Sequence, residues 1–471
     1  MNKDALLRFL RDGKHMTLGN QINLVALLSF PAILAQLSSI LMQYIDASMV
    51  GSLGAKASAS IGLTSTTIWL FGGLCTSAAT GFYVQVAHLI GSKNFTEAQN
   101  VLRQSIATTL LFVLVLTLIA LAIAPYLPVW LGGDSSICHD ATSYFVIFAA
   151  TLPLVQMKTL AGGMLRCSGN MKVPSMLNIL MCTLDVVFNF LFIFPTREIS
   201  IGNINITVYG FDLGVIGAAL GTSMSIIITC VLEWYFLLYR TPELDIRSTS
   251  GNYMPEQKNL RIWTKIGLPM GMEHAVMNCA QIASTFIVAP LGIAAIAANA
   301  FGITIESLCY MPGYGIMEAA TTLVGQSLGA KREQLANSFA TITITAGIII
   351  MTLMGILMYI YAPELMCFMT PDTEVQRLAT DALRIEAWAE PMFAASIVAY
   401  GVFVGRKTVF APCVLNLCSI WCIRITLAWW LSKNYGLNGI WLAMCIELCF
   451  RGLSSLILLR IKVRPKQQKQ T

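Results

Sequence analysis

The sequence predicts an all-α membrane protein with twelve transmembrane helices. The chain of 471 residues is 56% hydrophobic and only 11% charged, and its mean hydropathy is +0.70. Soluble domains carry about 25% charged residues, so most of this chain must face lipid or other apolar helices. Its hydrophobic residues come in runs of about 20 or more, the length that crosses a bilayer as a helix.

Each run is continuously apolar instead of alternating, which excludes a transmembrane β-barrel. Because lipid offers the backbone no hydrogen-bond partners, such runs must be helices. The segment before Asn20 is polar and the first run is too long for a signal-peptide core, so we expect an uncleaved first span. The twelve spans are predicted near residues 22–48, 58–89, 104–125, 140–162, 174–195, 213–239, 262–290, 295–324, 337–362, 385–404, 410–432 and 437–461.

Lysine and arginine favour the cytoplasmic side of membrane proteins. With the N-terminus inside, most of the 30 basic residues fall in cytoplasmic segments. We therefore expect a multi-pass protein of the cell inner membrane with both termini cytoplasmic. The net charge of +6 then reflects topology and attraction to membrane lipids, and requires no nucleic-acid partner. The exceptions are Lys56, Arg197, Arg377, Arg384 and Lys433 outside, and Lys158, Arg424 and Arg451 within spans.

Two other signals point away from enzymatic chemistry. Most of the 13 cysteines lie inside apolar runs, where they are expected to pack between helices. The sequence also has no phosphate-binding loop of the G-x-x-x-x-G-K-[ST] type. We expect no ATPase, no enzyme activity and no cofactor.

The chain repeats itself at a shift of 238 residues, with matches at prolines and glycines, which constrain the backbone most. The register holds for nearly 150 residues and then drops to 222, and the missing 16 residues match an extra external loop around Arg197–Tyr209. The matches include Pro31 with Pro269, Gly91 with Gly329, Lys93 with Lys331, Pro125 with Pro363, Asp134 with Asp372, Pro153 with Pro391, Pro174 with Pro412, and Asn178 with Asn416.

Six spans per half is an even number, so both halves enter the membrane in the same direction. Such parallel repeats, related by a pseudo-two-fold axis along the membrane normal, are typical of secondary transporters that rock around a site between the halves. We predict an N-terminal six-helix lobe over 1–240, a cytoplasmic linker over 241–261, and a C-terminal six-helix lobe with a basic cytoplasmic tail over 262–471. We expect a monomer.

Ionisable residues within spans cost about 2.5–3.5 kcal/mol or more, which makes each a candidate functional group. In the first half of the sequence, the ionisable residues lie within or at the end of polar stripes, which are rows of polar residues that are spaced to share one face of a helix. Helix–helix hydrogen bonding is the structural alternative for both stripes. The stripes are Gln36, Ser39, Gln43 and Asp46 in the first span, and Asn178, Cys182, Asp185 and Asn189 in the fifth.

The second half carries its acids on spans 7, 8 and 10. Glu386 and Glu390 lie near the predicted outer end, so an interfacial, solvated role stays open for them. Glu447 is a candidate to pair with Arg451, four residues later. The remaining candidates are Glu273 with the adjacent Asn278, and Glu306 with Tyr310 on one face of span 8.

The repeat duplicates the backbone residues but not the acids. Asp46 falls on Ser284, and Glu273 falls on Ala35. Acids that only join helices by hydrogen bonds would tend to persist in both copies of the repeat. Acids present in one copy therefore suggest that the two halves bind different ions or different parts of the substrate. An acidic, amide-lined cavity suits an organic cation or a proton.

Four segments carry a family resemblance. They are Pro31 with Asp46–Gly51, Ala87–Lys93 (AHLIGSK), Gly267–Pro269 through Glu273, and Leu323–Lys331 (LVGQSLGAK). On these segments the whole chain resembles the bacterial, NorM-like branch of the multidrug and toxic compound extrusion (MATE) transporters.

The resemblance implies export of cationic or amphipathic compounds driven by inward sodium or proton flow. It matches Asp46 to the family's first-lobe acid and Glu273 to a coupling-cation ligand. This chain departs from the family at two places. Asp185 and Asn189 stand in swapped order, and Phe393 replaces an expected aspartate, leaving Glu390 as the nearest acid to complete a sodium site with Glu273.

Two other functions remain open. A flippase for lipid-linked precursors has a related architecture, but usually has more spans and a basic cavity. A channel or scaffold without coupled transport does not need a two-lobe repeat that can rock. In the favoured exporter, protonating or metallating Asp46 and Asp185 would remove the charge that holds the organic cation.

Overall fold

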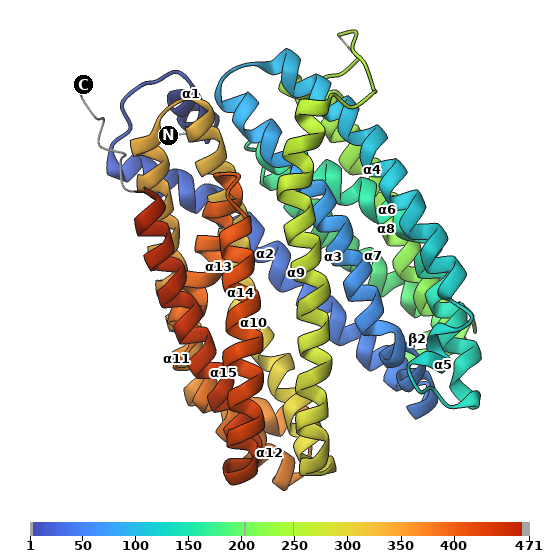
Figure 1. The fold of residues 1–471 in the computed structure, drawn as a ribbon. Helices are drawn as coiled ribbons and strands as arrows, with labels where there is room; N and C mark the ends of the chain where they lie inside the picture. The colour runs from blue at the N-terminus through green and yellow to red at the C-terminus, as the bar shows by residue number, and fades with distance from the viewer. Residues whose placement is uncertain (1–2, 202–203, 248, 464–471) are drawn as a thin grey trace. The chain divides into compact units, whose positions relative to one another are not determined.

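The computed structural model describes residues 3–201, 204–247 and 249–463. Long helices make up almost all of it (Figure 1), which confirms the predicted all-α membrane fold. The predicted basic tail lies outside the described residues from position 464 on.

The first six spans and their connections form the following elements. They are α1 (Lys3–Arg11), α2 (Leu18–Gly51), α3 (Ala55–Gly91), α4 (Phe95–Ile123), α5 (Leu127–Trp130), α6 (Ser135–Cys167), α7 (Lys172–Ile193), β1 (Pro195–Ile201), β2 (Ile204–Phe211), α8 (Gly214–Arg240) and η1 (Pro242–Leu244).

The remaining elements belong to the second half of the sequence. They are α9 (Gln257–Val288), η2 (Ala289–Leu291), α10 (Ile293–Gly329), α11 (Glu333–Met369), α12 (Thr373–Glu386), α13 (Glu390–Gly405), α14 (Phe410–Cys418), the π-helix η3 (Ser419–Ile425) and α15 (Thr426–Val463).

Ten helical stretches in the described part of the chain are long and apolar enough to cross a membrane. An eleventh is broken, because α12 and α13 are bent by 60° across a short gap. The stretch Phe410–Ile461 has 52 residues and breaks at Gly436, whose φ of 58° and ψ of −134° are non-helical. At 1.5 Å per residue it is more than twice as long as one span needs to be, so we count it as two. Counted in this way, the described residues contain twelve spans, where length and composition alone give ten or eleven.

Two of the elements that were not foreseen from the sequence lie outside the spans. The polar N-terminus contains α1, a short amphipathic helix that buries Leu6, Leu7 and Leu10. The predicted external loop is a β-hairpin, in which β1 and β2 pair antiparallel with Ile201 opposite Ile204. Its alternating β-branched residues favour strands, but a short hairpin leaves little signal beside long apolar runs.

The chain divides into two compact units. Unit 1 comprises the residues up to Gln36, Ala87–Lys93, and the residues from Met272 on; unit 2 comprises Leu37–Val86 and Asn94–Gly271. The helices α2, α3 and α9 therefore each contribute to both units. The predicted lobes over 1–240 and 262–471 stay a prediction.

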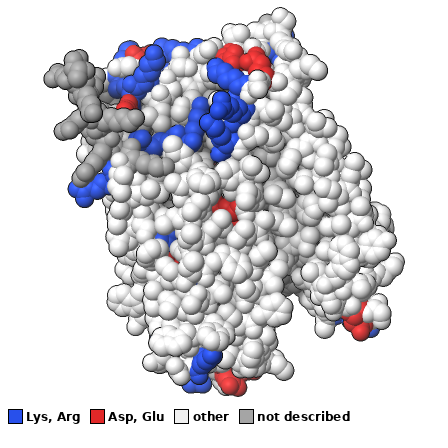
Figure 2. Space-filling model, in the orientation of Figure 1, with Lys and Arg blue, Asp and Glu red and all other residues white. Residues whose placement is uncertain are grey.

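Each unit has its own apolar core. In unit 1, α10, α11, α13 and α15 pack around buried residues such as Val398, Val402 and Phe403. In unit 2, α3, α4 and α6 enclose Phe71, Phe145 and neighbouring alanines. Figure 2 shows that side chains along the long helices are nearly all uncharged, whereas lysine and arginine gather near helix ends.

Contacts within unit 1 bring several predicted cytoplasmic segments together. Lys93 forms an ion pair with Asp12, and this ammonium group holds the pKa of the Asp12 carboxyl below its usual value. Arg332 donates from Nη1 to the carbonyl oxygens of Phe9 and Leu10, at 3.1 and 3.2 Å. The α1 helix is thus fastened to the connection between α10 and α11. The cytoplasmic location of these segments stays a prediction.

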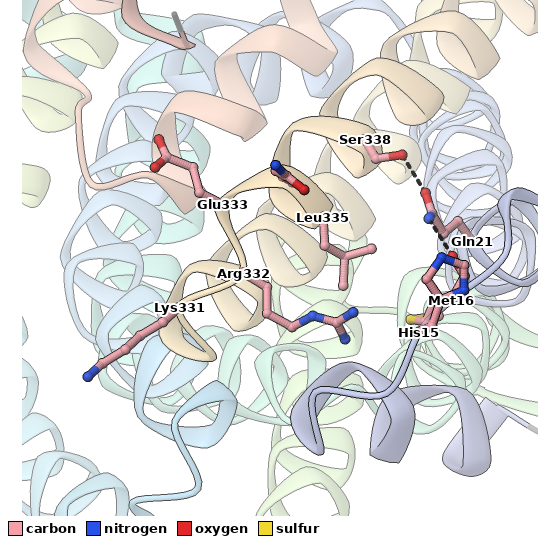
Figure 3. Close-up of a pocket in the computed structure, with 9 residues that line it drawn as sticks. His15, Met16, Gln21, Lys331, Arg332, Glu333, Leu335 and Ser338 are labelled. Carbon is pink, nitrogen blue, oxygen red and sulfur yellow. Dashed lines mark hydrogen bonds between the residues drawn. The ribbon is translucent and has the colours of Figure 1, made fainter. Parts of the chain in front are cut away.

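A pocket of about 500 Å³ opens near this connection. Figure 3 shows Gln21 between Met16 and Ser338, with hydrogen bonds to both, while Lys331 and Glu333 point away. None of the residues that line the pocket is a predicted site residue. The acids that concern transport must therefore be sought elsewhere.

The ends of α3 and α10 cross within unit 1 at two glycines that the repeat relates. A Cβ atom on Gly91 would lie 2.0 Å from the carbonyl oxygen of Gln326, and one on Gly329 would lie 2.0 Å from that of His88. His88 and Gln326 are themselves repeat partners, 238 residues apart. The contact is therefore reciprocal, as a two-fold relation requires, and it supports the pseudo-two-fold axis.

Substituting Gly329 by alanine should destabilise the protein, because the added methyl group would overlap backbone rather than a movable side chain. Overpacking of this kind costs about 1–3 kcal/mol. Thermal unfolding of the purified protein in detergent should show a lower midpoint for Gly329→Ala than for Gly62→Ala, since nothing lies within 4 Å of a Cβ at Gly62. Equal midpoints would contradict the close crossing.

Candidate ion-binding sites

Unit 2 brings together the two polar stripes predicted on spans 1 and 5. The side-chain amide of Asn189 on α7 donates to Asp46 Oδ1 on α2 at 2.9 Å and to Asp185 Oδ2 at 3.1 Å. Nearer the other end of the stripes, Asn178 donates to Ser39 Oγ at 2.8 Å. Helical spacing thus aligns the two stripes face to face along their length.

This cluster holds two carboxyl groups with one amide between them. Asp185 and Asn189 are buried, whereas Asp46 is only half-buried. Within the described part of the chain, Asp185 Oδ1 and Asn189 Oδ1 have no hydrogen-bond partner. Gly221 on α8 makes room for the cluster, because a Cβ there would lie 2.1 Å from Asn189 Oδ1. Acceptor oxygens without hydrogen-bond partners, next to the partly exposed carboxyl of Asp46, are suited to binding a proton or a cation.

The other two predicted members of the first stripe are not part of this cluster. Gln36 belongs to unit 1 and not to unit 2, which holds the cluster. Gln43 is exposed.

A second acid is held in unit 1. Glu273 on α9 accepts hydrogen bonds from Tyr400 Oη on α13 and from Asn416 Nδ2 on α14, each at 2.6 Å. Sequence reasoning missed both partners, although Asn416 is the repeat partner of Asn178, which bonds to the first span of its own half. The predicted neighbour Asn278 bonds to the carbonyl oxygen of His274 in its own helix, at 2.8 Å.

Three further acids of unit 1 are buried. Glu306 lies on α10 and is 5% exposed, while Glu386 and Glu390 are both 0% exposed. The last two residues flank the break between α12 and α13, and all four of their carboxyl oxygens lack a hydrogen-bond partner among the described residues. The solvated, interfacial role left open for Glu386 and Glu390 is therefore wrong, because tertiary packing covers the break between their helices.

A buried ion-pair triad lies in the same unit. Glu447 on α15 accepts from Arg424 Nε and Nη2, at 3.1 and 2.9 Å, and pairs with Arg451 Nε at 3.2 Å. Ser419 Oγ donates to the same carboxylate at 2.6 Å. The predicted pairing of Glu447 with Arg451 is confirmed. The π-helix η3 begins at Ser419 and includes Arg424 near its end. Such π-helical distortions are frequent at functional sites.

Aromatic rings of α10 and α13 pack together in unit 1. The Tyr310 ring, a predicted site residue, packs edge-on against Phe393 at 5.4 Å and against Tyr314 at 6.0 Å. The guanidinium carbon of Arg451 lies 5.5 Å from the Phe393 ring centroid. A cation of the protein itself thus lies against the position where the resemblance leads one to expect an aspartate.

No group of three or more His, Cys, Asp or Glu side chains within the described ranges is arranged to hold a metal ion. The proposed sodium ligands Glu273 and Glu390 also differ in surroundings, since Glu273 has two hydrogen-bond donors and Glu390 has none among the described residues. A metal ion between them would need oxygen ligands from other groups.

Long apolar helices with acids buried between them define a polytopic membrane protein. The MatE family model matches residues 31–191 and 269–430, more than half of the chain. The protein belongs to the MatE family, which confirms the resemblance seen in the sequence, and the two matched ranges fall on the two copies of the repeat.

Known proteins resemble the chain over almost its whole length. The probable multidrug resistance protein NorM of Thermotoga maritima is 22% identical, with 91% of this chain and 90% of the relative covered. Its namesake in Bacillus thuringiensis subsp. konkukian is 25% identical, covering 94% and 96%. A crystal structure of MATE in complex with MaL6 has a TM-score of 0.86 at 20% identity and covers 97% and 98% of the two chains. An outward-facing multidrug resistance MATE transporter of the MOP superfamily has a TM-score of 0.87 at 19% identity, covering 97% of each chain.

Removing the Glu447 carboxylate should destabilise unit 1, since two guanidinium groups would lose their shared partner in a buried site. Breaking a buried ion pair costs about 3–5 kcal/mol. In detergent, Glu447→Ala should unfold at a lower temperature than Glu364→Ala, which removes an exposed carboxylate from α11. If the two variants unfold together, the triad contributes nothing to stability.

Proposed function

We propose that the protein is a secondary active multidrug exporter, which exchanges organic cations or amphipathic compounds for sodium ions or protons by rocking alternating access. The observation that carries the proposal is the cluster of Asp46, Asn189 and Asp185 in unit 2. Supporting it, the full-length relatives from Thermotoga and Bacillus are named probable multidrug resistance proteins.

The cluster offers a simple exchange. With both carboxyls ionised, Asp46 and Asp185 attract an organic cation; with a proton or sodium ion bound, that attraction is lost. A ligand can drive a conformational change only by binding one state more tightly than the other. Asn189 contributes by holding the two carboxyls on one amide, so that a charge change at one carboxyl is felt at the other.

Glu273 is the corresponding candidate in unit 1. Tyr400 and Asn416 occupy one carboxylate oxygen each, which fixes the direction of the group while leaving lone pairs for a small cation. Glu306, Tyr310 and Glu390 are further candidate binding residues of that unit. The acids of the two sites are not at equivalent positions of the repeat, so we assign the two sites different roles in binding ions or substrate.

The setting follows from the same proposal. The exporter would be a monomer in the cell inner membrane with both termini cytoplasmic, and it would use the ion gradient instead of a cofactor or catalysis. Its partners would be small organic cations and membrane lipids, with no role for nucleic acid. The alternatives, a lipid-linked precursor flippase and an uncoupled channel, are less well supported, because the buried groups of the first site are acids and amides rather than bases.

Transport assays in proteoliposomes test the proposal directly. Efflux of ethidium, a fluorescent organic cation, should follow an imposed sodium or pH gradient, and Asp46→Asn and Glu273→Gln should each lower that gradient-driven rate about tenfold or more. A hydrogen bond to a charged group is worth about 1.5–3 kcal/mol, which corresponds to that factor. Glu374→Gln, at an exposed carboxylate on α12, is the control. Unchanged gradient dependence in both site variants would overturn the assignment.

A further inference from the structure

We propose that unit 1 contains a proton-binding site formed by Glu306, Glu386 and Glu390, separate from the Glu273 site and compensated by the guanidinium groups of Arg424 and Arg451 instead of by a metal ion. This inference rests on the proposed function, because it names the ion that unit 1 takes. Glu386 was not among the predicted site residues, and it supplies the key observation.

The burial of the two glutamates at the helix break is the first step. Glu386 and Glu390 are 0% exposed, and no described group donates a hydrogen bond to either carboxyl. A carboxylate buried without partners is far costlier than a neutral carboxylic acid in the same place. The arrangement is therefore suited to carboxyls that carry protons for at least part of the transport cycle.

The surrounding charges set how many protons fit. Glu447 pairs with both guanidiniums, Glu306 lies within electrostatic range of both, and Glu386 lies within range of Arg424. Glu390 faces Glu306. Full ionisation of these four carboxyls would give four negative charges against two positive ones. Binding of two protons neutralises the cluster. The titratable or charged groups that face Glu386 or Glu390 are Glu306 and Cys309 on α10, Arg424 on η3, and Cys445 and Glu447 on α15. Arg451 reaches the cluster through Glu306 and Glu447.

Helix ends distinguish the two glutamates. Glu386 lies in the last turn of α12, where the helix dipole disfavours a negative charge, and Glu390 lies in the first turn of α13, where it favours one. The dipoles of the two helix ends therefore act in opposite directions on a negative charge at these two positions. Since the two helices are bent by 60° at the intervening gap, a change of charge at Glu390 acts on a break in the span.

A proton fits this site better than sodium does. No metal-holding group of three side chains occurs in the described part of unit 1, and the cluster already contains two cations of its own. Arg451 lies against the Phe393 ring, the position where the resemblance leads one to expect a metal-binding aspartate. A proton binds a single carboxyl oxygen and adds no volume, whereas a sodium ion would need several oxygen ligands around one point, which the described residues do not provide.

Infrared difference spectroscopy of the purified full-length protein in detergent tests the site without any drug. Between acidic and alkaline pH, the wild-type protein should show a carbonyl band of buried protonated carboxyls. Glu386→Gln and Glu390→Gln should each remove part of that band. Glu364→Gln, an exposed carboxylate on α11, should leave the band unchanged. Glutamine matches the shape of a protonated glutamate, so both variants are expected to fold.

Addition of sodium chloride at fixed pH decides between the ions. The part of the band assigned to Glu386 and Glu390 should persist at high sodium, with potassium chloride as the ionic-strength control. Loss of that part with sodium but not potassium would overturn the inference, as would spectra in which neither variant differs from wild type. Ethidium efflux that stays coupled to a gradient in those cases would show that the proposed exporter function stands on its own.

Discussion

A carboxyl group between membrane helices is stable only if a donor, a cation or a proton compensates it, and this requirement organises both units. In unit 2 the amide of Asn189 serves Asp46 and Asp185 together. In unit 1 Glu273 has two donors of its own, and Glu447 has two guanidiniums. Glu386 and Glu390 differ from these acids, because neither oxygen of either carboxyl has a hydrogen-bond partner among the described residues.

The internal repeat explains why the two halves compensate their buried acids in different ways. Asn178 and Asn416 occupy the same place in the two copies and both reach the helix that begins their half, but one meets Ser39 and the other Glu273. Where the backbone itself is in contact, the copies stay alike: Gly91 and Gly329 cross reciprocally, since any side chain there would overlap the facing carbonyl. Duplication thus kept the steric framework and left the acids free to diverge.

Much of the fold was predictable because lipid imposes simple rules. Span length, continuous apolarity and the placement of lysine and arginine depend on local sequence alone, and the stripes that end at Asp46 and Asp185 have a period that identifies their shared face. The pairing of Glu447 with Arg451 is also local, at one helical turn. The hairpin β1–β2, the broken span at Glu386 and the π-helix at Ser419 carried no comparable signal.

The sequence by itself determined a polytopic, internally repeated MatE-family protein with acids inside its spans, because hydropathy, periodicity and repeat spacing are written along the chain. Only the tertiary structure decided which acids have partners. Glu386 appeared interfacial in the sequence but is covered by packing, and Glu273 acquires Tyr400 and Asn416 from helices more than a hundred residues away. Compensation of a buried charge depends on distances in space between helices, and no local pattern encodes those distances.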